Sequence, residues 1–241
     1  MKIRTITTGI SLESPKQRER IIQAADFNQK AKDLFEQQGY EVQTTRIATN
    51  SWAELSTSTT EIITEIQELE QICQNLNVSF FSIGYISSPE KIAIIPELNQ
   101  NTSIVHCSSK IGDRNGIIFE NAQESAKVIK SIAEITPGGY GNFKFCAWAN
   151  CNSVIPFFPA SYHEGETAFA IGLECSDLVM QAFSSCNNLS LAEQNLRAIF
   201  EAELIKVAAI AQQVSDKFEI KYHGIDASLA PFLDKSRPSR L

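Results

Sequence analysis

Between Val154 and Gly165 the chain reads Val-Ile-Pro-Phe-Phe-Pro-Ala-Ser-Tyr-His-Glu-Gly, an apolar run that gives way at once to polar and titratable residues. This pattern predicts a buried strand that runs into a functional loop. The carboxyl ends of parallel strands are where α/β sheets bind their ligands. We therefore expect a binding or active site in this loop. Its predicted members are Ser161, Tyr162, His163 and Glu164.

Strands and helices alternate on the amino-terminal side of this stretch. Because a strand followed by a helix and a second strand is typical of a parallel crossover, we expect a mainly parallel sheet. Ser14 and Pro15 resemble the cap and first residue of a helix that ends at Gly39. The predicted strands span 3–10, 40–49, 78–86, 102–107 and 143–149, and the helices between them begin near 15, 52, 89 and 121.

On the carboxyl-terminal side, apolar spacing predicts a helix over 166–183, with Phe169 and Leu173 on its buried face. A capping box at 190–193 predicts the start of the longest helix. A last strand is expected at 219–225. With no repeat and no Pro/Gly/Ser-rich linker, a single α/β domain over 1–241 is the simplest partition.

Composition excludes several classes of function. The formal net charge is -7, and the only basic cluster, Lys235, Arg237 and Arg240, is small, so we expect no nucleic-acid partner. No leader and no apolar run long enough for a bilayer is evident, which favours a soluble cytoplasmic protein. The six cysteines form no Cys-x-x-Cys pair and are expected to be buried, reduced thiols.

A catalytic role is predicted for His163, Glu164 and Asp226. Histidine titrates near neutral pH, and a carboxylate can hold its tautomer. The alternatives are that His163 binds a backbone carbonyl, that Glu164 caps the following helix, and that Asp226 forms an Asx-turn. We expect no metal site. Less favoured alternatives are a metal held by Cys146 and Cys151, or by His163 and Glu164 with His223 or Asp226.

Substrate binding is predicted for Arg46 and Gln43 on the second strand, together with Ser161, Tyr162 and Ser228. A guanidinium binds carboxylate or phosphate through two parallel hydrogen bonds. The alternative for Arg46 is a surface salt bridge. Arg4 and Thr7 on the first strand are weaker candidates.

Common catalytic motifs are missing, including the phosphate-binding Walker loop, Gly-x-Ser-x-Gly, Gly-x-Gly-x-x-Gly and His-Glu-x-x-His. Four stretches together nevertheless resemble an uncharacterised bacterial and archaeal family, a domain of unknown function whose members are often labelled "PFL family protein". The resemblance covers essentially the whole chain. It is carried by 4–7, 39–46, 157–165 and 224–231.

This resemblance implies an α/β barrel with strands inside and helices outside, similar to pyruvate formate-lyase and other glycyl radical enzymes, and it implies no known reaction. Neither the carboxyl-terminal radical glycine nor the reactive cysteine of those enzymes has a match, so radical chemistry does not follow from the fold. Family members run well past the Gly224–Asp226 stretch. The chain is thus expected to be a short member, or the amino-terminal part of a longer barrel with strand edges to cover.

The leading functional hypothesis is a cytosolic enzyme-like barrel that binds, and transforms, a small polar or anionic metabolite at the strand ends. The expected partners are that small molecule and further copies of the chain, and the cofactor is unknown. The first alternative is a metabolite sensor in which the same polar groups only bind. The second is an oligomeric scaffold without a ligand.

Overall fold

The computed structural model describes residues 1–51, 59–153, 155–184 and 186–228. An eight-stranded sheet forms its centre, in the order β5-β4-β3-β2-β1-β7-β8 with β6 also paired to β4. The strands are β1 (Lys2–Ile10), β2 (Val42–Thr49), β3 (Phe80–Ile86), β4 (Val105–Asp113), β5 (Gly116–Ile117), β6 (Phe145–Ala149), β7 (Ala168–Glu174) and β8 (Lys221–Asp226).

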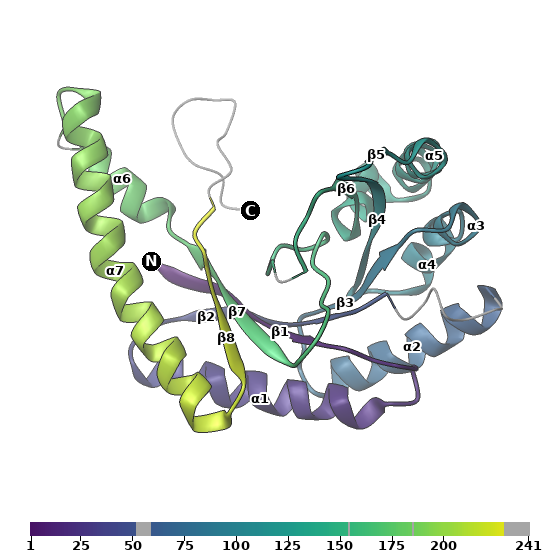
Figure 1. The fold of residues 1–241 in the computed structure, drawn as a ribbon, viewed down its shortest axis with the longest axis horizontal. Helices are drawn as coiled ribbons and strands as arrows, with labels where there is room; N and C mark the ends of the chain where they lie inside the picture. Colours follow the sequence, from purple (N-terminus) through teal and green to yellow (C-terminus); the bar gives the residue numbers. More distant parts are fainter. Residues whose placement is uncertain (52–58, 154, 185, 229–241) are drawn as a thin grey trace.

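Two sets of parallel strands make up this sheet. β1, β2, β3, β4 and β6 run parallel to one another, and so do β7 and β8, whereas the short β5 is antiparallel to β4. The two sets meet at β1 and β7, which are antiparallel. In the described part of the chain the sheet curves without closing (Figure 1). The α/β class is therefore confirmed, whereas the predicted barrel is not.

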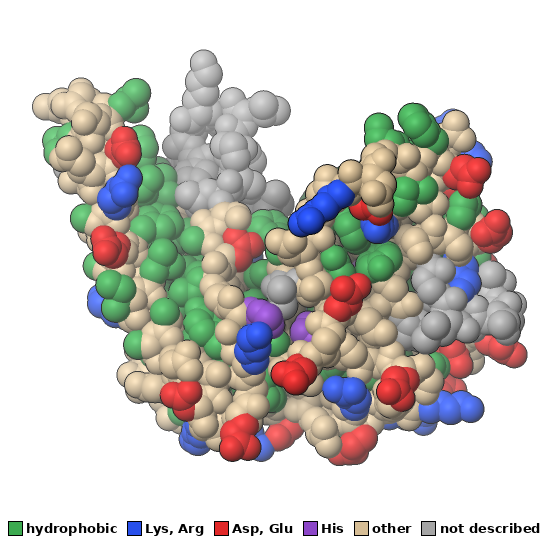
Figure 2. Space-filling model, viewed as in Figure 1, with side chains coloured by type: hydrophobic (Ala, Val, Ile, Leu, Met, Phe, Trp, Pro, Cys, Tyr) green, Lys and Arg blue, Asp and Glu red, His purple; other side chains and the backbone are tan. Residues whose placement is uncertain are grey.

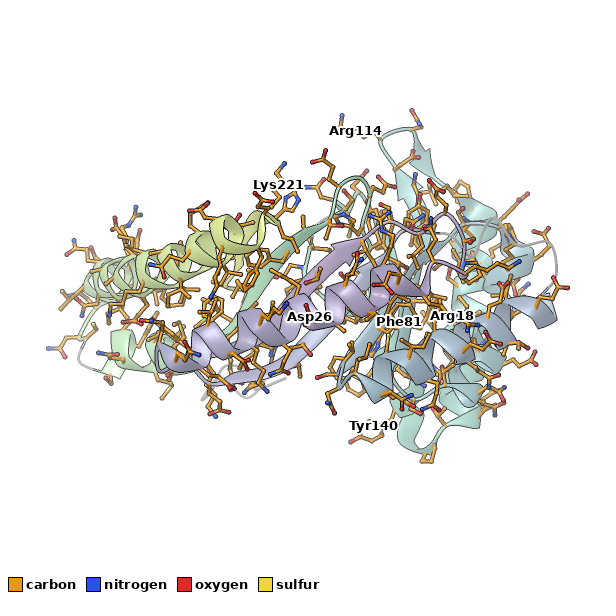
Figure 3. All side chains as sticks on the ribbon, turned by 90° about the horizontal axis from the view of Figure 1, so that it is seen from below. Arg18, Asp26, Phe81, Arg114, Tyr140 and Lys221 are labelled. Carbon is orange, nitrogen blue, oxygen red and sulfur yellow. The ribbon has the colours of Figure 1, made fainter. Side chains whose placement is uncertain are left out.

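Helices cover the convex face of the sheet and leave much of the concave face to a long loop (Figure 1). Seen from below, α1 and α2 cross in front of the strands, and the labelled Arg18 of α1 forms an ion pair with Glu68 of α2 (Figure 3). The helices are α1 (Arg18–Gln37), α2 (Thr59–Asn75), α3 (Pro89–Ile92), α4 (Ile95–Asn101), α5 (Phe119–Ile135), α6 (Ser176–Ser184) and α7 (Leu189–Phe218), with a 3-10 helix η2 (Pro137–Lys144).

Two apolar clusters hold the helices on the sheet. One includes Ile47, Ile66 and Phe81 and joins α1, α2 and α5 to β2, β3 and β4. The other includes Phe35 and Phe169 and joins α1 and α7 to β1 and β7. Because full burial of such a side chain stabilises the fold by about 2 kcal/mol, these clusters are the main source of stability.

Two secondary-structure predictions between residues 155 and 183 are wrong. Residues 155–165 form no strand, since Pro156 and Pro159 lack the N–H that a strand interior needs. The predicted helix over 166–183 is instead β7 followed by α6. Phe169 and Leu173 are four residues apart, as on one face of a helix. Together with Ile171 they also occupy every second position, as on one face of a strand, and the segment forms a strand because it pairs with β1.

Several boundaries also differ from the prediction. Gly39, with φ of +85°, follows the end of α1 as predicted, but α1 begins at Arg18 rather than Pro15. β4 extends to Asp113, beyond the predicted end at Cys107. The predicted start of the second helix, at 52–58, lies outside the described residues.

The start of α7 can be tested. Its cap is Asn188, whose Oδ1 accepts a hydrogen bond of 2.9 Å from the N–H of Leu191, and not the predicted Ser190. Asn188→Ala should lower the free energy of unfolding in urea by about 1 kcal/mol, because the cap is lost. Ser190→Ala, the matched control, should have almost no effect. A larger loss of stability from Ser190→Ala than from Asn188→Ala would instead support the predicted capping box.

Candidate functional site

The loop between β6 and β7 lies across the concave face of the sheet. Ser82 Oγ on β3 donates a hydrogen bond of 2.6 Å to the carbonyl of Ser161, and the N–H of His163 donates to Thr49 O on β2 at 3.0 Å. The ring of Phe158 contacts Phe80 and His106, with centroids 6.2 and 5.1 Å apart. The loop is thus fixed to three neighbouring strands.

A cavity of about 470 Å³ opens between this loop and the sheet. Figure 2 shows the molecule hollowed on this side, between the arm formed by α7 and the lobe that carries β4 and α5. A volume in this range is usual for small-molecule sites. The apolar lining comes mainly from Phe80, Phe143, Pro156, Phe157 and Phe158, and the titratable lining from Arg4, Arg46, His106, Lys144, Glu174, Cys175 and Asp226.

Two arginines from neighbouring strands face this cavity. A register shift between Ile3 and Thr5 interrupts the alternation of β1, so that Arg4 and Thr5 both line the cavity. Arg46 is held by a hydrogen bond of 3.1 Å from its Nε to Thr44 Oγ1. Its guanidinium carbon also lies 4.9 Å from the ring centre of Phe80. Among the described residues, neither arginine forms an ion pair.

Burial, and next the charge of Arg4, lower the pKa of Arg46 to about 10, which leaves the guanidinium charged at neutral pH. A buried cation costs free energy unless an anion or hydrogen-bond acceptors compensate it. The predicted alternative of a surface salt bridge does not fit Arg46. The described residues thus leave a cationic site open to an anion.

Lys144 extends this cationic side, and His106 lies next to Arg46 and Lys144. Lys144 Nζ donates to the carbonyls of Asn99 and Thr102, at 2.8 and 2.6 Å. His106 Nδ1 lies 3.0 Å from Ile104 O, so Nδ1 carries the proton and Nε2 keeps its lone pair. Burial lowers the pKa of His106 to about 4; the bond to Ile104 raises this pKa, and the charges of Arg46 and Lys144 lower it. The imidazole is therefore neutral.

Carboxylates lie on the opposite side of the cavity, at the ends of β7 and β8. Asp226 Oδ1 accepts a hydrogen bond of 2.8 Å from the N–H of Ser228, which is the Asx-turn considered as the alternative for Asp226. Glu174 Oε2 accepts a bond of 2.7 Å from Gln43 Nε2. Gln43 thus holds a cavity residue without lining the cavity itself, and Ser228 lines it directly.

The other predicted site residues lie elsewhere. Ser161 and His163 are each 1% exposed, and Glu164 points to solvent. His163 Nε2 donates to Glu166 O at 2.7 Å, as the carbonyl alternative expected, and burial lowers its pKa. Tyr162 stacks on Trp148 at 5.2 Å. Ser161, Tyr162 and His163 line only a water-sized space of about 10 Å³.

Strand direction explains this separation. His163 lies at the carboxyl ends of β1 and β2, beside Gly9 and Thr49. Asp226 lies at the carboxyl end of β8. Because β8 is parallel to β7, and β7 is antiparallel to β1, this end of β8 lies beside the amino end of β1, away from His163. The structure therefore unites Arg46, Asp226 and Ser228 and leaves His163 apart from them.

Five titratable cavity residues were not among the main candidates from the sequence, and one of them is the buried thiol of Cys175. Arg4 was a weaker one, and its signal was position on the first strand. His106, Lys144 and Glu174 carried no motif, although a histidine inside the apolar run of β4 is a signal that sequence reasoning could have used. No group of three metal-ligating side chains is present in the part of the chain that the structure describes.

Comparison with known proteins identifies the family. The model described as "Uncharacterised ACR (DUF711)" matches residues 1–238. The chain belongs to the DUF711 family. It is similar to a "UPF0210 protein" of Actinobacillus pleuropneumoniae serotype 5b (strain L20), with 27% identity over 264 aligned residues that cover 95% of this chain and 57% of the relative.

A second relative, the "UPF0210 protein" of Neisseria gonorrhoeae (strain ATCC 700825 / FA 1090), is 27% identical over 225 residues, which cover 83% of this chain and 48% of the relative. The chain thus spans about half the length of the curated relatives it matches. The predicted membership of an uncharacterised domain-of-unknown-function family is confirmed, whereas the predicted likeness to pyruvate formate-lyase is not. Across the described ranges, no helix is both long and apolar enough to span a membrane.

Proposed function

We propose that this protein binds a small organic anion, carrying a carboxylate or phosphate, in the cavity beneath the 150–167 loop. The observation that supports this most directly is the pair Arg4 and Arg46, which line one cavity and have no ion pair among the described residues. Two guanidiniums can each form paired hydrogen bonds to one anion.

The surroundings suit such a ligand. Arg46 is fixed against Phe80 and Phe158, so little side-chain entropy is lost when it binds. Asn28 of α1 fixes the strand itself, since its Nδ2 donates to Arg46 O at 3.0 Å while its Oδ1 accepts from Thr8 Oγ1 at 2.7 Å. The aromatic lining would contact the apolar part of the ligand.

Turnover of this ligand remains part of the hypothesis. Neutral His106, with a free Nε2, is the group in the cavity best suited to accept a proton from a bound molecule. Asp226 and Ser228 line the cavity, and their predicted roles in catalysis and in substrate binding stay predictions. The predicted catalytic roles of His163 and Glu164, and the cytoplasmic location, stay predictions.

The barrel and the homo-oligomer also stay proposals. β8 pairs only with β7 in the described ranges, so one edge of the curved sheet is open to a further strand. Sedimentation velocity tests the oligomer: a concentration-independent dimer supports it, and a monomer at high protein concentration contradicts it.

Calorimetric titration with acetate, caproate and inorganic phosphate tests the binding proposal. Arg46→Gln should weaken binding of the preferred anion at least tenfold, about 1.4 kcal/mol, because a charged hydrogen bond is lost. Arg4→Gln should have a similar effect, and Ser228→Ala a smaller one.

Arg197→Gln is the matched control, since Arg197 is an exposed arginine of α7 paired with Glu193. It removes the same charge without touching the cavity and should leave the affinity unchanged. Equal weakening by Arg46→Gln and Arg197→Gln would show only an effect of net charge and would contradict the proposed site.

A further inference from the structure

Charges in the cavity are separated along the order of the strands. Lys144 lies at the β4 side, Arg46 on β2 and Arg4 on β1, whereas Glu174 ends β7 and Asp226 ends β8. The boundary between the cationic and the acidic half is the antiparallel junction of β1 and β7. Across the described residues no ion pair joins the two halves.

The acidic half contains two carboxylates that line the cavity from the neighbouring strands β7 and β8. Gly172 is the register partner of Asp226 in the parallel pair β7–β8, and Glu174 follows Gly172 by two positions on the same face. At the usual strand spacing and rise, the Cα atoms of Glu174 and Asp226 are roughly 8 Å apart. Each carboxylate uses one oxygen, for Ser228 N or Gln43 Nε2, and makes no described hydrogen bond through the other.

Two adjacent carboxylates repel each other, and a cation placed between them removes this repulsion. A monoanion bound to Arg4 and Arg46 would leave the acidic half unpaired and would itself be repelled by it. A molecule with a positive group at its other end satisfies both halves.

From these contacts we propose that the cavity takes a zwitterion, with its carboxylate or phosphate on Arg4 and Arg46 and its ammonium or guanidinium group on Glu174 and Asp226. This inference rests on the proposed function. It adds the second charge, the direction in which the ligand lies, and a middle section that is apolar because Pro156, Phe157 and Phe158 cover it.

The size of the ligand follows from the sheet. Arg46 is in register, through Thr7, with Ala170 of β7, so Glu174 lies two strands away and four residues further along. At the usual strand spacing and rise their Cα atoms are roughly 16 Å apart, and the two side chains shorten this span. A chain of several carbons between the two charges therefore fits better than an α-amino acid backbone alone. Cys175 lies beside the acidic half, but burial raises the pKa of its thiol to about 11, so it adds no charge.

Matched pairs of probes test this proposal by calorimetric titration. β-Alanine, γ-aminobutyrate and ε-aminocaproate carry an ammonium group that propionate, butyrate and caproate lack. The natural protein should bind the longer zwitterions about tenfold more tightly than the matched monoanions, as expected for one additional charged hydrogen bond. The preference should grow with chain length.

Isosteric variants of the acidic half provide the second measurement. Asp226→Asn keeps an oxygen for the Asx-turn with Ser228, and Glu174→Gln keeps an acceptor for Gln43, so both should fold. Each should reduce the preference for ε-aminocaproate over caproate, and the double variant should abolish it without weakening caproate. Arg46→Gln should weaken both probes.

The outcomes separate the two proposals. If caproate binds through Arg46 but the zwitterion has no advantage, the anion site stands and the zwitterion is excluded. If neither probe binds the natural protein, both proposals are contradicted. If the preference persists in the double variant, the ammonium group lies elsewhere and the assignment of Glu174 and Asp226 is wrong.

Discussion

Gly9→Ala is expected to destabilise the protein by about 3 kcal/mol, at the upper end of the usual cost of overpacking. A Cβ built on Gly9 would lie 2.1 Å from His163 Nδ1 and 2.4 Å from its Cγ. The imidazole has no room to move away, because it is buried, its backbone N–H is bonded to Thr49 O and its Nε2 to Glu166 O. Urea unfolding and a melting temperature lower by roughly 10 °C would show this loss.

A double-mutant cycle provides the control. His163→Ala removes the ring that obstructs the new methyl group, so Gly9→Ala should cost less than about 1 kcal/mol in that background. An equal cost in both backgrounds would show that the strand, and not its packing against the loop, requires glycine. The cycle thereby tests whether the 150–167 loop is fixed to the end of β1.

Acid should destabilise the protein through His106. Its pKa is about 4 in the folded state against 6.5 for an ordinary histidine, so between these values the unfolded chain binds more protons than the folded one. This contribution is complete above pH 6.5 and is lost as the pH falls toward 4. The loss should reach about 3 kcal/mol, measured as the free energy of unfolding at a series of pH values.

His106→Asn isolates this effect, because an asparagine Nδ2 can donate to Ile104 O as the imidazole Nδ1 does. Its stability should fall less steeply than that of the natural protein between pH 6.5 and 4. Burial also lowers the pKa values of His163 and His223, and these groups act equally in both proteins. Parallel curves would contradict a buried neutral His106.

Local sequence patterns predicted those elements in which the hydrophobic period and the residues at the ends indicate the same secondary structure. Alternating β-branched residues mark β1 and β2, and the spacing of Ile62, Ile66, Leu69 and Cys73 marks the buried face of α2. The prediction of a helix where β7 lies was wrong, because the spacing of Phe169 and Leu173 fits a helix as well as a strand. Only pairing with β1 distinguishes the two. Of the apolar run, the described residues 155–159 lie in a loop, in which Pro156 is buried and Phe157 is exposed.

The candidate site depended on long-range geometry, and so only part of it could be predicted. Arg46 was chosen for its position on a strand, and that strand does face the cavity. Arg4 gained its place from a bulge in β1, which no local pattern announces. His163 and Asp226 both follow the carboxyl-end rule, yet the antiparallel junction places those ends apart. Strand order and direction were the missing information.

The position of β1 also has a consequence for how the chain folds. Among the described strands β1 is synthesised first, yet it is an inner strand of the sheet, and its second neighbour, β7, ends only at Glu174. Until β7 is synthesised, one edge of β1 has no partner, and closing so long a loop is slow. We expect nascent chains that end before β7 to be sensitive to proteases and to recruit chaperones. This sensitivity should fall sharply once β7 has emerged from the ribosome.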